Sequence, residues 1–199
     1  MDIAILALQG AFAEHRKMLE GLGVHCFEVR NAADFERSKD GLIIPGGEST
    51  TQAKLLRELG LIQGVKGFIE AGGAVFGTCA GLILLAKDVV GESFARLETM
   101  HIRARRNAYG RQLGSFETVA RMDGVGEIPM TFIRAPYITE VEAGVEVLAK
   151  VDGRIVAARE GRQLVTAFHP ELGTDTRVHE YFLRMIFAAG GCNVCGNMV

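Results

Sequence analysis

A cysteine between two glycines is the residue of this chain best suited to nucleophilic chemistry. In Ala74–Gly81, three apolar residues precede Gly77 and Cys79, and an apolar helical run, Leu82–Ala86, follows. Strand, tight turn and helix in this order are typical of a nucleophile elbow, here with cysteine in place of serine. Glycines let strand and helix approach closely around a strained central residue, and N–H groups at the helix start favour a thiolate. A buried structural cysteine beside a glycine-rich turn is the alternative.

A histidine and a glutamate two positions apart could complete a catalytic triad. His169 and Glu171 flank Pro170 directly after a predicted strand, Gln163–Phe168. In an extended segment such side chains point the same way, so Glu171 can accept from one imidazole nitrogen while the other faces outward. We expect Glu171 near the surface edge, so that Glu171→Gln weakens turnover without preventing folding. A surface turn is the alternative for this motif alone, but together with Cys79 it favours a triad.

A glycine loop supplies backbone donors. Gly46, Gly47 and Glu48 follow a third buried strand, Gly41–Ile44, and N–H groups at such a strand-to-helix turn suit an oxyanion or a carboxylate. A tight turn with a helix cap is the alternative, and no Walker loop is present because no Gly-Lys-Ser/Thr follows. A thiolate, a histidine base, a glutamate and an oxyanion hole indicate acyl transfer through a thioester. Attack on a carboxamide would release ammonia and leave an acyl-Cys79 for water to hydrolyse.

The first half of the chain alternates buried strands with amphipathic helices. This alternation predicts an α/β fold with a doubly wound, mostly parallel, flavodoxin-like sheet and ligands at the carboxyl ends of its strands. Gln9, Gly46–Gly47 and Cys79 all follow strand ends, so we expect them at one edge of the sheet. Ser49 or Thr50 is expected to cap the helix after the glycine loop. The predicted strands are 2–8, 24–29, 41–44 and 74–76, and the predicted helices include 11–22 and 62–71.

The second half predicts a mixed or antiparallel extension. Short strand-like stretches are separated by turn signals, and Asp152-Gly153 between two of them is a strong hairpin signal. A last helix, capped by Thr174 or Asp175, has Val178, Phe182, Met185 and Ile186 on one face. The predicted strands are 100–105, 115–120, 131–133, 145–151, 154–159 and 163–168.

Composition indicates an ordinary globular protein. The chain has 199 residues, of which 48% are hydrophobic and 23% charged, and a net charge of −2, which suggests neither nucleic-acid binding nor a disordered acidic or basic segment. We expect one domain over residues 1–190 and a flexible tail over 191–199. The N-terminus begins a strand without signal-peptide features, no apolar run is long enough for a membrane span, and the cysteines do not resemble a disulfide framework; the cytoplasm is therefore expected.

Other polar residues carry weaker signals. A run of arginines is expected to be mostly a solvated strand face, although one arginine could bind a substrate carboxylate bidentately. The Cys192–Cys195 pair lacks the further ligands of a zinc site and the strand–helix setting of a redox motif, so neither metal nor cofactor is expected. Four histidines lack partners in sequence, so packing or surface positions are expected for them. These arginines are Arg103, Arg105, Arg106 and Arg111, and these histidines are His15, His25, His101 and His179.

The joint presence of Gly-Thr-Cys-Ala-Gly (77–81) and Phe-His-Pro-Glu-Leu (168–172) resembles the triad, or class I, glutamine amidotransferases. More narrowly, the chain resembles the glutaminase subunits of pyridoxal 5′-phosphate synthase, and the likeness runs from about Ile3 to Phe187. Residues 93–102 match only loosely, and Gly173 stands where this family commonly has Thr. The stretches that carry the narrower likeness are 8–15, 45–50, 106–112, 115–117 and 132–136.

The resemblance implies a role for each site residue. Cys79 would be the nucleophile, His169 the base and Glu171 its orienter, with an oxyanion hole from the amides of Gly47 and Ala80. The same resemblance implies that ammonia passes to a separate synthase subunit in a large hetero-oligomer, with Gln9 at the docking surface. L-Glutamine would be held by Gly46, Gly47, Glu48, Arg106, Ile133 and Arg134.

Two alternatives remain at this point. A glutaminase of histidine or purine synthesis would share the triad, although Leu8–His15 and Arg106–Gln112 argue against it. A non-enzymatic, redox-sensing protein with an elbow cysteine on a flavodoxin-like sheet would need no glutamate two residues after a histidine.

Overall fold

A computed structural model describes residues 1–106 and 114–188 of the chain. The predictions for Arg111, for Cys192 and Cys195, and for a tail over 191–199 fall outside these residues. Within the described ranges, no helix is long and apolar enough to cross a membrane. The strands of the described residues join one twelve-stranded sheet, whose main path runs β2-β1-β3-β4-β12-β11-β10-β7-β8.

The first five strands of that path are parallel and form the buried centre of the molecule. All residues of β3 and β4 are buried, as expected for strands covered on both faces. In register, Ile44 lies opposite Gly77 and Thr166 opposite Thr78, so three strands end at the same edge. The predicted doubly wound sheet is therefore confirmed. These strands are β1 (Asp2–Leu6), β2 (His25–Val29), β3 (Gly41–Ile44), β4 (Ala74–Thr78) and β12 (Gln163–Thr166).

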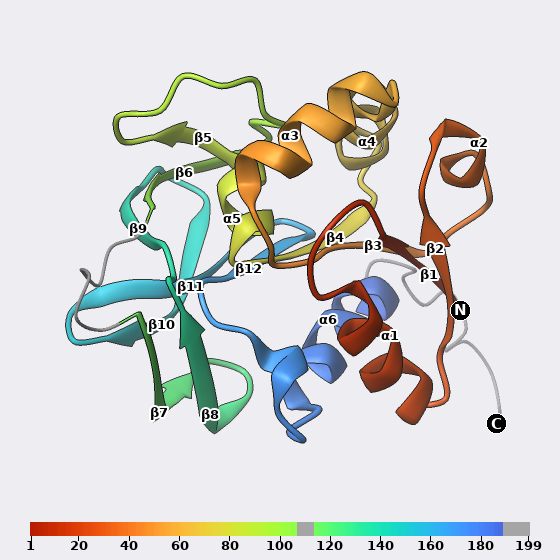
Figure 1. Ribbon diagram of the computed structural model, residues 1–199. Helices are drawn as coiled ribbons and strands as arrows, with labels where there is room; N and C mark the ends of the chain where they lie inside the picture. The colour runs from red at the N-terminus through yellow and green to blue at the C-terminus, as the bar shows by residue number, and fades with distance from the viewer. Residues whose placement is uncertain (107–113, 189–199) are drawn as a thin grey trace, which may run out of the picture.

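Helices cover both faces of this parallel region. In Figure 1, α1 (Phe12–Gly21) and α6 (Arg177–Ala188) lie on one face. The other face is covered by α3 (Ser49–Glu58), α4 (Leu61–Glu70) and α5 (Ala80–Leu85). The predicted apolar side of α6 is confirmed, because Val178, Phe182, Met185 and Ile186 are all buried.

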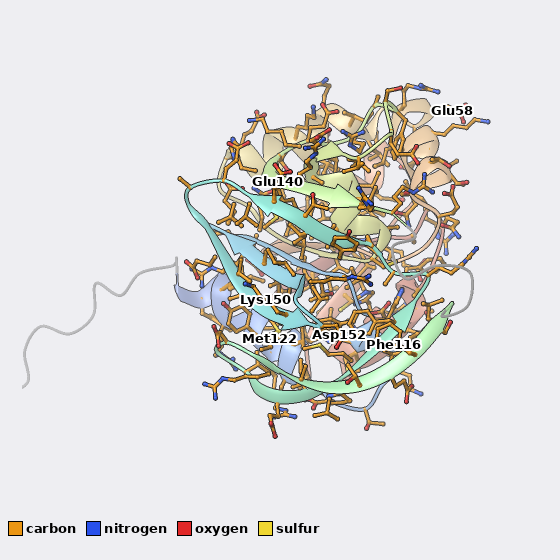
Figure 2. The ribbon with its side chains drawn as sticks, turned by 90° about the vertical axis from the view of Figure 1, so that its left-hand side faces the viewer. Glu58, Phe116, Met122, Glu140, Lys150 and Asp152 are labelled. Carbon is orange, nitrogen blue, oxygen red and sulfur yellow. The ribbon has the colours of Figure 1, made fainter. Side chains whose placement is uncertain are left out.

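The rest of the sheet is the mixed extension that the sequence predicts. The Asp152-Gly153 turn has φ values of +50° and +75°, and it joins β10 to antiparallel β11 as a tight hairpin should. Figure 2 shows this turn, labelled at Asp152, near the long β7–β8 hairpin that carries Phe116. The extension contains β5 (Ala86–Val89), β6 (Met100–Arg105), β7 (Ser115–Met122), β8 (Gly126–Ile133), β9 (Tyr137–Val141), β10 (Val145–Val151) and β11 (Arg154–Glu160).

Three short elements were not predicted from the sequence. Strand β5 follows α5 with no intervening turn residue, so it lacks the boundary that marks a strand in sequence. Strand β9 (Tyr137–Val141) lies between Pro136 and Gly144 and pairs with β6 and β11, yet it was not predicted. Helix α2 (Ala32–Phe35) is a single turn, whose Asp34 amide donates to the side chain of Asn31.

The predicted capping of α3 by Ser49 or Thr50 is wrong, because Glu48 occupies this position. The backbone of Glu48 is extended, and its carboxylate accepts the Thr51 N–H at 2.8 Å and the Thr50 N–H at 3.3 Å. A carboxylate satisfies these free donors and also interacts favourably with the positive end of the helix. At α6, Asp175, one of the two predicted residues, accepts the Arg177 amide at 3.1 Å.

Candidate active site

The predicted strand–turn–helix around Cys79 is present, and its backbone is strained. Cys79 lies between β4 and α5 with φ of +48° and ψ of −94°, a left-handed region that residues with a Cβ rarely adopt. A Cβ on Gly81 would lie 2.2 Å from Ile44 O, and one on Gly77 would lie 2.8 Å from Gly81 C. Both glycines are therefore required for the close approach of strand and helix at this turn.

The loop after β12 brings His169 to the same edge. The His169 amide donates to Thr131 O at 2.8 Å, which ties this loop to β8. Imidazole Nδ1 lies 2.7 Å from Glu171 Oε1, so Nδ1–H donates to this carboxylate and Nε2 is left for Cys79. Histidine and glutamate are thus joined as the sequence predicts.

The local backbone that joins them differs from the prediction. Pro170–Leu172 form a turn of 3₁₀ helix rather than an extended segment. The fixed φ of proline suits the first position of a helix, so Pro170 starts this turn. Glu171 therefore reaches His169 Nδ1, at 2.7 Å, from within a 3₁₀ turn rather than from an extended segment.

The expected position of Glu171 near the surface edge is also wrong. Its side chain is fully buried, because α1 packs over the 3₁₀ turn. Burial opposes its ionisation, but the imidazoles of His15 and His169 outweigh burial and lower the pKa of Glu171 below the usual value. The carboxylate is therefore ionised at neutral pH.

The charge state of His169 follows from its two partners. Burial would lower the pKa of His169, but hydrogen bonding to Cys79 and to Glu171 raises it to about 10. An imidazole of this kind stays protonated beside a thiolate and can give its proton to a leaving group.

Two further histidines, His15 and His179, form a buried cluster next to Glu171. No partner was expected for either of them from the sequence. His15 of α1 and His179 of α6 are both completely buried, and His15 Nδ1 lies 2.9 Å from His179 Nε2. His15 Nε2 lies 3.1 Å from Thr78 Oγ1 and 3.5 Å from Glu171 Oε2. Burial lowers the pKa of both histidines, that of His179 to about 3, so both are neutral at pH 7.

A signal for this cluster was present in the sequence. His15 recurs at helical spacing with apolar residues, and His179 follows Val178 on the side of its helix that is predicted to be buried. A polar residue on such a face must have a partner, because an unpaired buried polar group is costly. The other two histidines lie at the surface as expected, although they too are paired: His25 with Asp2 and His101 with Glu160.

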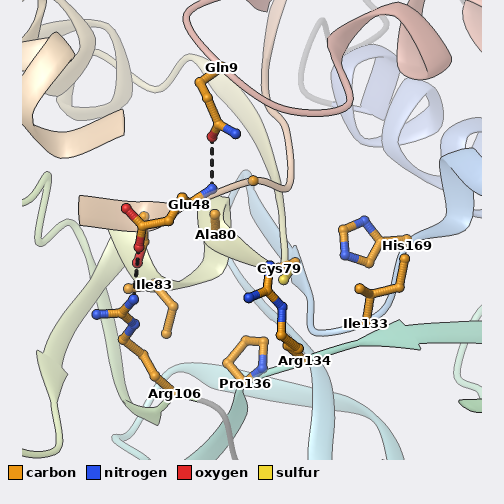
Figure 3. Close-up of a pocket in the computed structure, with 12 residues that line it drawn as sticks. Gln9, Glu48, Cys79, Ala80, Ile83, Arg106, Ile133, Arg134, Pro136 and His169 are labelled. Carbon is orange, nitrogen blue, oxygen red and sulfur yellow. Dashed lines mark hydrogen bonds and ion pairs between the residues drawn. The ribbon is translucent and has the colours of Figure 1, made fainter. Parts of the chain in front are cut away.

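A pocket of about 280 Å³ opens over Cys79. Figure 3 shows His169 on one side of Cys79 and Glu48 with Arg106 on the other. The proposed oxyanion donors and five of the six residues predicted to hold substrate line this pocket. Its lining comprises Gln9, Gly47, Glu48, Ser49, Cys79, Ala80, Ile83, Arg106, Ile133, Arg134, Pro136 and His169.

Gly46 is the predicted substrate residue that does not line the pocket. It lies underneath, where a Cβ would be 2.3 Å from His169 Cε1 and 3.4 Å from Cys79 Cβ. Its amide donates to Thr78 Oγ1 at 2.8 Å. Gly46 therefore provides the space in which the imidazole lies. Ser49, Ile83 and Pro136 also line the pocket and were not predicted as site residues, although Ser49 and Pro136 lie in the stretches 45–50 and 132–136 that carry the family likeness.

Charged residues gather at the far end of the pocket from His169. Arg106 bridges two carboxylates, with Nη2 2.9 Å from Glu48 Oε1 and Nη1 3.0 Å from Glu92 Oε1. Burial would raise the pKa of Glu48, but hydrogen bonds from Thr50 and Thr51 lower it to about 2. This end therefore offers both a fixed anion and a fixed cation. Arg103, by contrast, pairs with Asp88 and Glu140 and does not line the pocket.

Gln9 belongs to the rim of this pocket. Its Oε1 accepts the Glu48 amide at 2.7 Å (Figure 3). Its backbone oxygen accepts from Gln52 Nε2 at 2.8 Å. Hydrogen bonds thus connect the β1–α1 loop to the glycine loop at the pocket that contains Cys79.

Residues 5–188 match the SNO glutamine amidotransferase family. The chain belongs to this family.

Relatives of known name support the assignment. Pyridoxal 5′-phosphate synthase subunit PdxT of Methanocorpusculum labreanum is 61% identical over 186 residues, which cover 94% of this chain and 98% of that protein. The subunit of the same name from Streptococcus pneumoniae is 56% identical and covers 93% and 97%. A crystal structure of a glutamine amidotransferase has a TM-score of 0.89 at 45% identity and covers 93% and 98%. PurLQS from Thermotoga maritima, at 14% identity and a TM-score of 0.68, shares the fold over 92% and 97% of the two chains.

Proposed function

We propose that this glutamine amidotransferase hydrolyses L-glutamine to L-glutamate and ammonia through a thioester on Cys79. The observation that carries the proposal is a strained elbow cysteine at the floor of a pocket, beside a histidine that a buried glutamate orients at 2.7 Å. We further propose that residues 1–190 act as one amidotransferase domain.

In the first half-reaction, the thiolate of Cys79 attacks the carboxamide carbon and a C–S bond forms. The carbonyl oxygen becomes an oxyanion, for which the amides of Gly47 and Ala80 are the proposed donors. His169 then gives its Nε2 proton to the amide nitrogen, the C–N bond breaks, and ammonia leaves an acyl-cysteine.

In the second half-reaction, water attacks the thioester. His169, now neutral, takes a proton from the water, the C–S bond breaks, and glutamate is released. The sulfur leaves as the thiolate, and protonated His169 is restored. Glu171 stays ionised throughout, since its part is to hold the tautomer and orientation of the imidazole.

The charged end of the pocket suits the α-amino and α-carboxylate groups of glutamine. We assign the ammonium to the Glu48 carboxylate and the carboxylate to a guanidinium, that of Arg106 or Arg134, since both line the pocket. Ile133 supplies an apolar wall for the methylenes, and Gly47 leaves room for the reacting amide, while Gly46 leaves room for the imidazole of His169.

The ammonia is proposed to pass to a separate synthase subunit. Two relatives at 56% identity or more are named as subunits of pyridoxal 5′-phosphate synthase, which supports a role in vitamin B6 biosynthesis. Free ammonia would protonate and diffuse away, so a covered route to the acceptor is needed. The assembly is proposed to be a large hetero-oligomer. Gln9, on the pocket rim, is proposed to lie at the surface that docks on the synthase subunit and, through its hydrogen bond to the Glu48 amide, to link docking to the glycine loop.

The two alternatives fare less well. A glutaminase of another pathway has weaker support, because PurLQS from Thermotoga maritima shares the fold at only 14% identity, whereas relatives at 56% and 61% identity are named as subunits of pyridoxal 5′-phosphate synthase. A redox sensor would not need the buried Glu171 beside His169.

Ammonia release from glutamine, measured with and without purified synthase subunit, tests the proposal. Wild-type chain with synthase should release ammonia, and Cys79→Ala should lower the rate at least about 10⁴-fold, since the nucleophile is lost. Unchanged release by Cys79→Ala would refute the thioester route. Co-purification with a synthase of another pathway would refute the assignment to vitamin B6 biosynthesis.

A further inference from the structure

The two carboxylate oxygens of Glu171 have different surroundings. Oε1 accepts from His169 Nδ1 at 2.7 Å. Oε2 is buried and has no hydrogen-bond partner within the described residues. The polar atom that faces it is Nε2 of His15, at 3.5 Å, a separation longer than a full hydrogen bond but short enough for a strong charge–dipole interaction.

The ionised carboxylate selects one proton arrangement for the histidine pair. A bare nitrogen lone pair turned towards Oε2 would repel it, which favours the tautomer of His15 with its proton on Nε2, directed towards Glu171 Oε2 and Thr78 Oγ1. His15 Nδ1 is then an acceptor, and the Nε2–H of His179 donates to it at 2.9 Å. The remaining nitrogen, Nδ1 of His179, is buried without a partner in the described part of the chain, and in this arrangement it is a lone pair rather than an unpaired N–H.

We infer that His15 is a positioning residue of the active site: its Nε2–H holds the second oxygen of Glu171, and His179 holds the tautomer of His15. The interaction fixes the carboxylate, and through it the plane of His169. This inference rests on the proposed glutaminase activity.

The same histidine also ties the triad to the glycine loop. Thr78 Oγ1 contacts His15 Nε2 at 3.1 Å and accepts the Gly46 amide at 2.8 Å. At the start of α1, the Ala11 amide donates to Gly46 O at 3.0 Å. Helix α1 therefore contacts Gly46 at its first turn and Glu171 one turn later, so that a shift of the helix would move the imidazole and the glycine loop together.

Two polar substitutions, His15→Gln and His15→Asn, distinguish the role of Nε2 of His15 from that of Nδ1. A glutamine at position 15 can place an amide N–H near the location of Nε2, whereas an asparagine reaches only as far as Nδ1. We expect His15→Gln to keep kcat within 3-fold of wild type, and His15→Asn to lower kcat at least 10-fold with KM for glutamine within 3-fold. His25→Gln, at the surface, is the control and should match wild type. Equal kcat in the two position-15 variants, or a loss confined to KM, would overturn the inference.

A double-mutant cycle tests whether His15 acts through Glu171. In a Glu171→Gln background, His15→Asn should lower kcat by less than 2-fold further, because the group that it positions has already changed. Multiplied losses would overturn the inference. Imidazole nitrogen chemical shifts of the wild-type chain give a test that needs no variant, and a proton on Nδ1 of His15 would also overturn it.

These results are distinguishable from failure of the proposed function. A wild-type chain that releases no ammonia with its synthase refutes the glutaminase proposal. Normal wild-type release together with an unaffected His15→Asn refutes only the positioning role.

Discussion

His169 stands between two regions of opposite character. On the pocket side, charged groups are partly exposed: the Arg106 side chain is 23% exposed and that of Glu48 44%. On the other side, Glu171, His15 and His179 are almost wholly withdrawn from water. The comparison teaches that binding groups can be held by partly exposed ion pairs and hydrogen bonds, whereas the group that orients a base is held by a buried network in which each proton position depends on the next.

The two regions also come from different parts of the chain. The buried side is built from β4, α1, the loop after β12 and α6, all belonging to the parallel region of the fold. The pocket side adds Arg106, Ile133, Arg134 and Pro136 from the extension. Substitutions in the extension can thus alter the contacts with substrate, while residues of the parallel region still hold the imidazole of His169 in its orientation.

Among the substitutions that test this comparison, the largest effect is expected where the two regions meet, at Gly46. A methyl group from Gly46→Ala would lie 2.3 Å from His169 Cε1, which forces the imidazole away from both Cys79 and Glu171. We expect kcat/KM for glutamine to fall at least 10³-fold, or about 4 kcal/mol, as measured by ammonia release with the synthase present. Gly67→Ala is the matched control, since its methyl group would meet nothing within 4 Å; comparable activity of the two variants would show that the imidazole is not confined in this way.

Glu171→Gln acts on the buried side alone. Burial of Glu171 replaces the mild surface effect expected from sequence with a larger one. An amide cannot accept from His169 and from His15 as a carboxylate does, so we expect kcat to fall about 10²-fold or more, or about 3 kcal/mol. The free energy of unfolding, measured by urea titration, should fall by about 1–3 kcal/mol. Full activity with native stability would mean that the buried side does not orient the base.

Much of the parallel fold was predictable from sequence because its strands are buried on both faces and read as continuous apolar runs. Strand β3 of this region was predicted with its observed bounds. In the extension, β6 and β10 were also predicted with their observed bounds. The short elements β5, β9 and α2 were not predicted, since tertiary pairing rather than local sequence determines them. The capping of α3 by Glu48 was missed for a local reason, because Ser and Thr are preferred at this position of a helix and glutamate is not.

The site was predictable where chemistry lies in a short motif. Cys79, His169 and Glu171 stand in such motifs, and the structure brings them together. What could not be predicted depends on packing between distant elements: α1 buries Glu171, and α1 and α6 bring His15 within 2.9 Å of His179 across 164 positions of sequence. No spacing rule joins two single histidines on separate helices.

A pH dependence of stability should mark the buried side. The pKa of His179 is lowered to about 3, mainly by burial and then by His15, so the folded chain binds fewer protons than the unfolded chain below pH 6.5. Stability is therefore lost as pH falls from 6.5 towards 3. Between pH 6.5 and 5.0 the contribution of His179 is about 2 kcal/mol.

Urea unfolding of wild type and of His179→Gln at these two pH values measures this contribution. The loss of stability on acidification should be smaller in the variant by about 2 kcal/mol, although His15 and Glu171 leave some dependence in the same direction. An identical dependence in wild type and His179→Gln would mean that His179 is charged in the folded chain.

The smallest effect is expected on the pocket side, from Arg106→Gln. Its two ion pairs are partly exposed and each contributes about 0–1 kcal/mol, so the free energy of unfolding should change by less than about 1 kcal/mol. The loss of a guanidinium that holds substrate should raise KM for glutamine about 10-fold, or about 1.4 kcal/mol, with kcat nearly unchanged. Arg103→Gln is the matched control, because Arg103 also bridges two carboxylates, at 2.7 and 3.1 Å, but outside the pocket. If Arg106→Gln instead lowered kcat at constant KM, Arg106 would act on the reacting atoms, and the separation between a solvated binding side and a buried orienting side would fail at this residue.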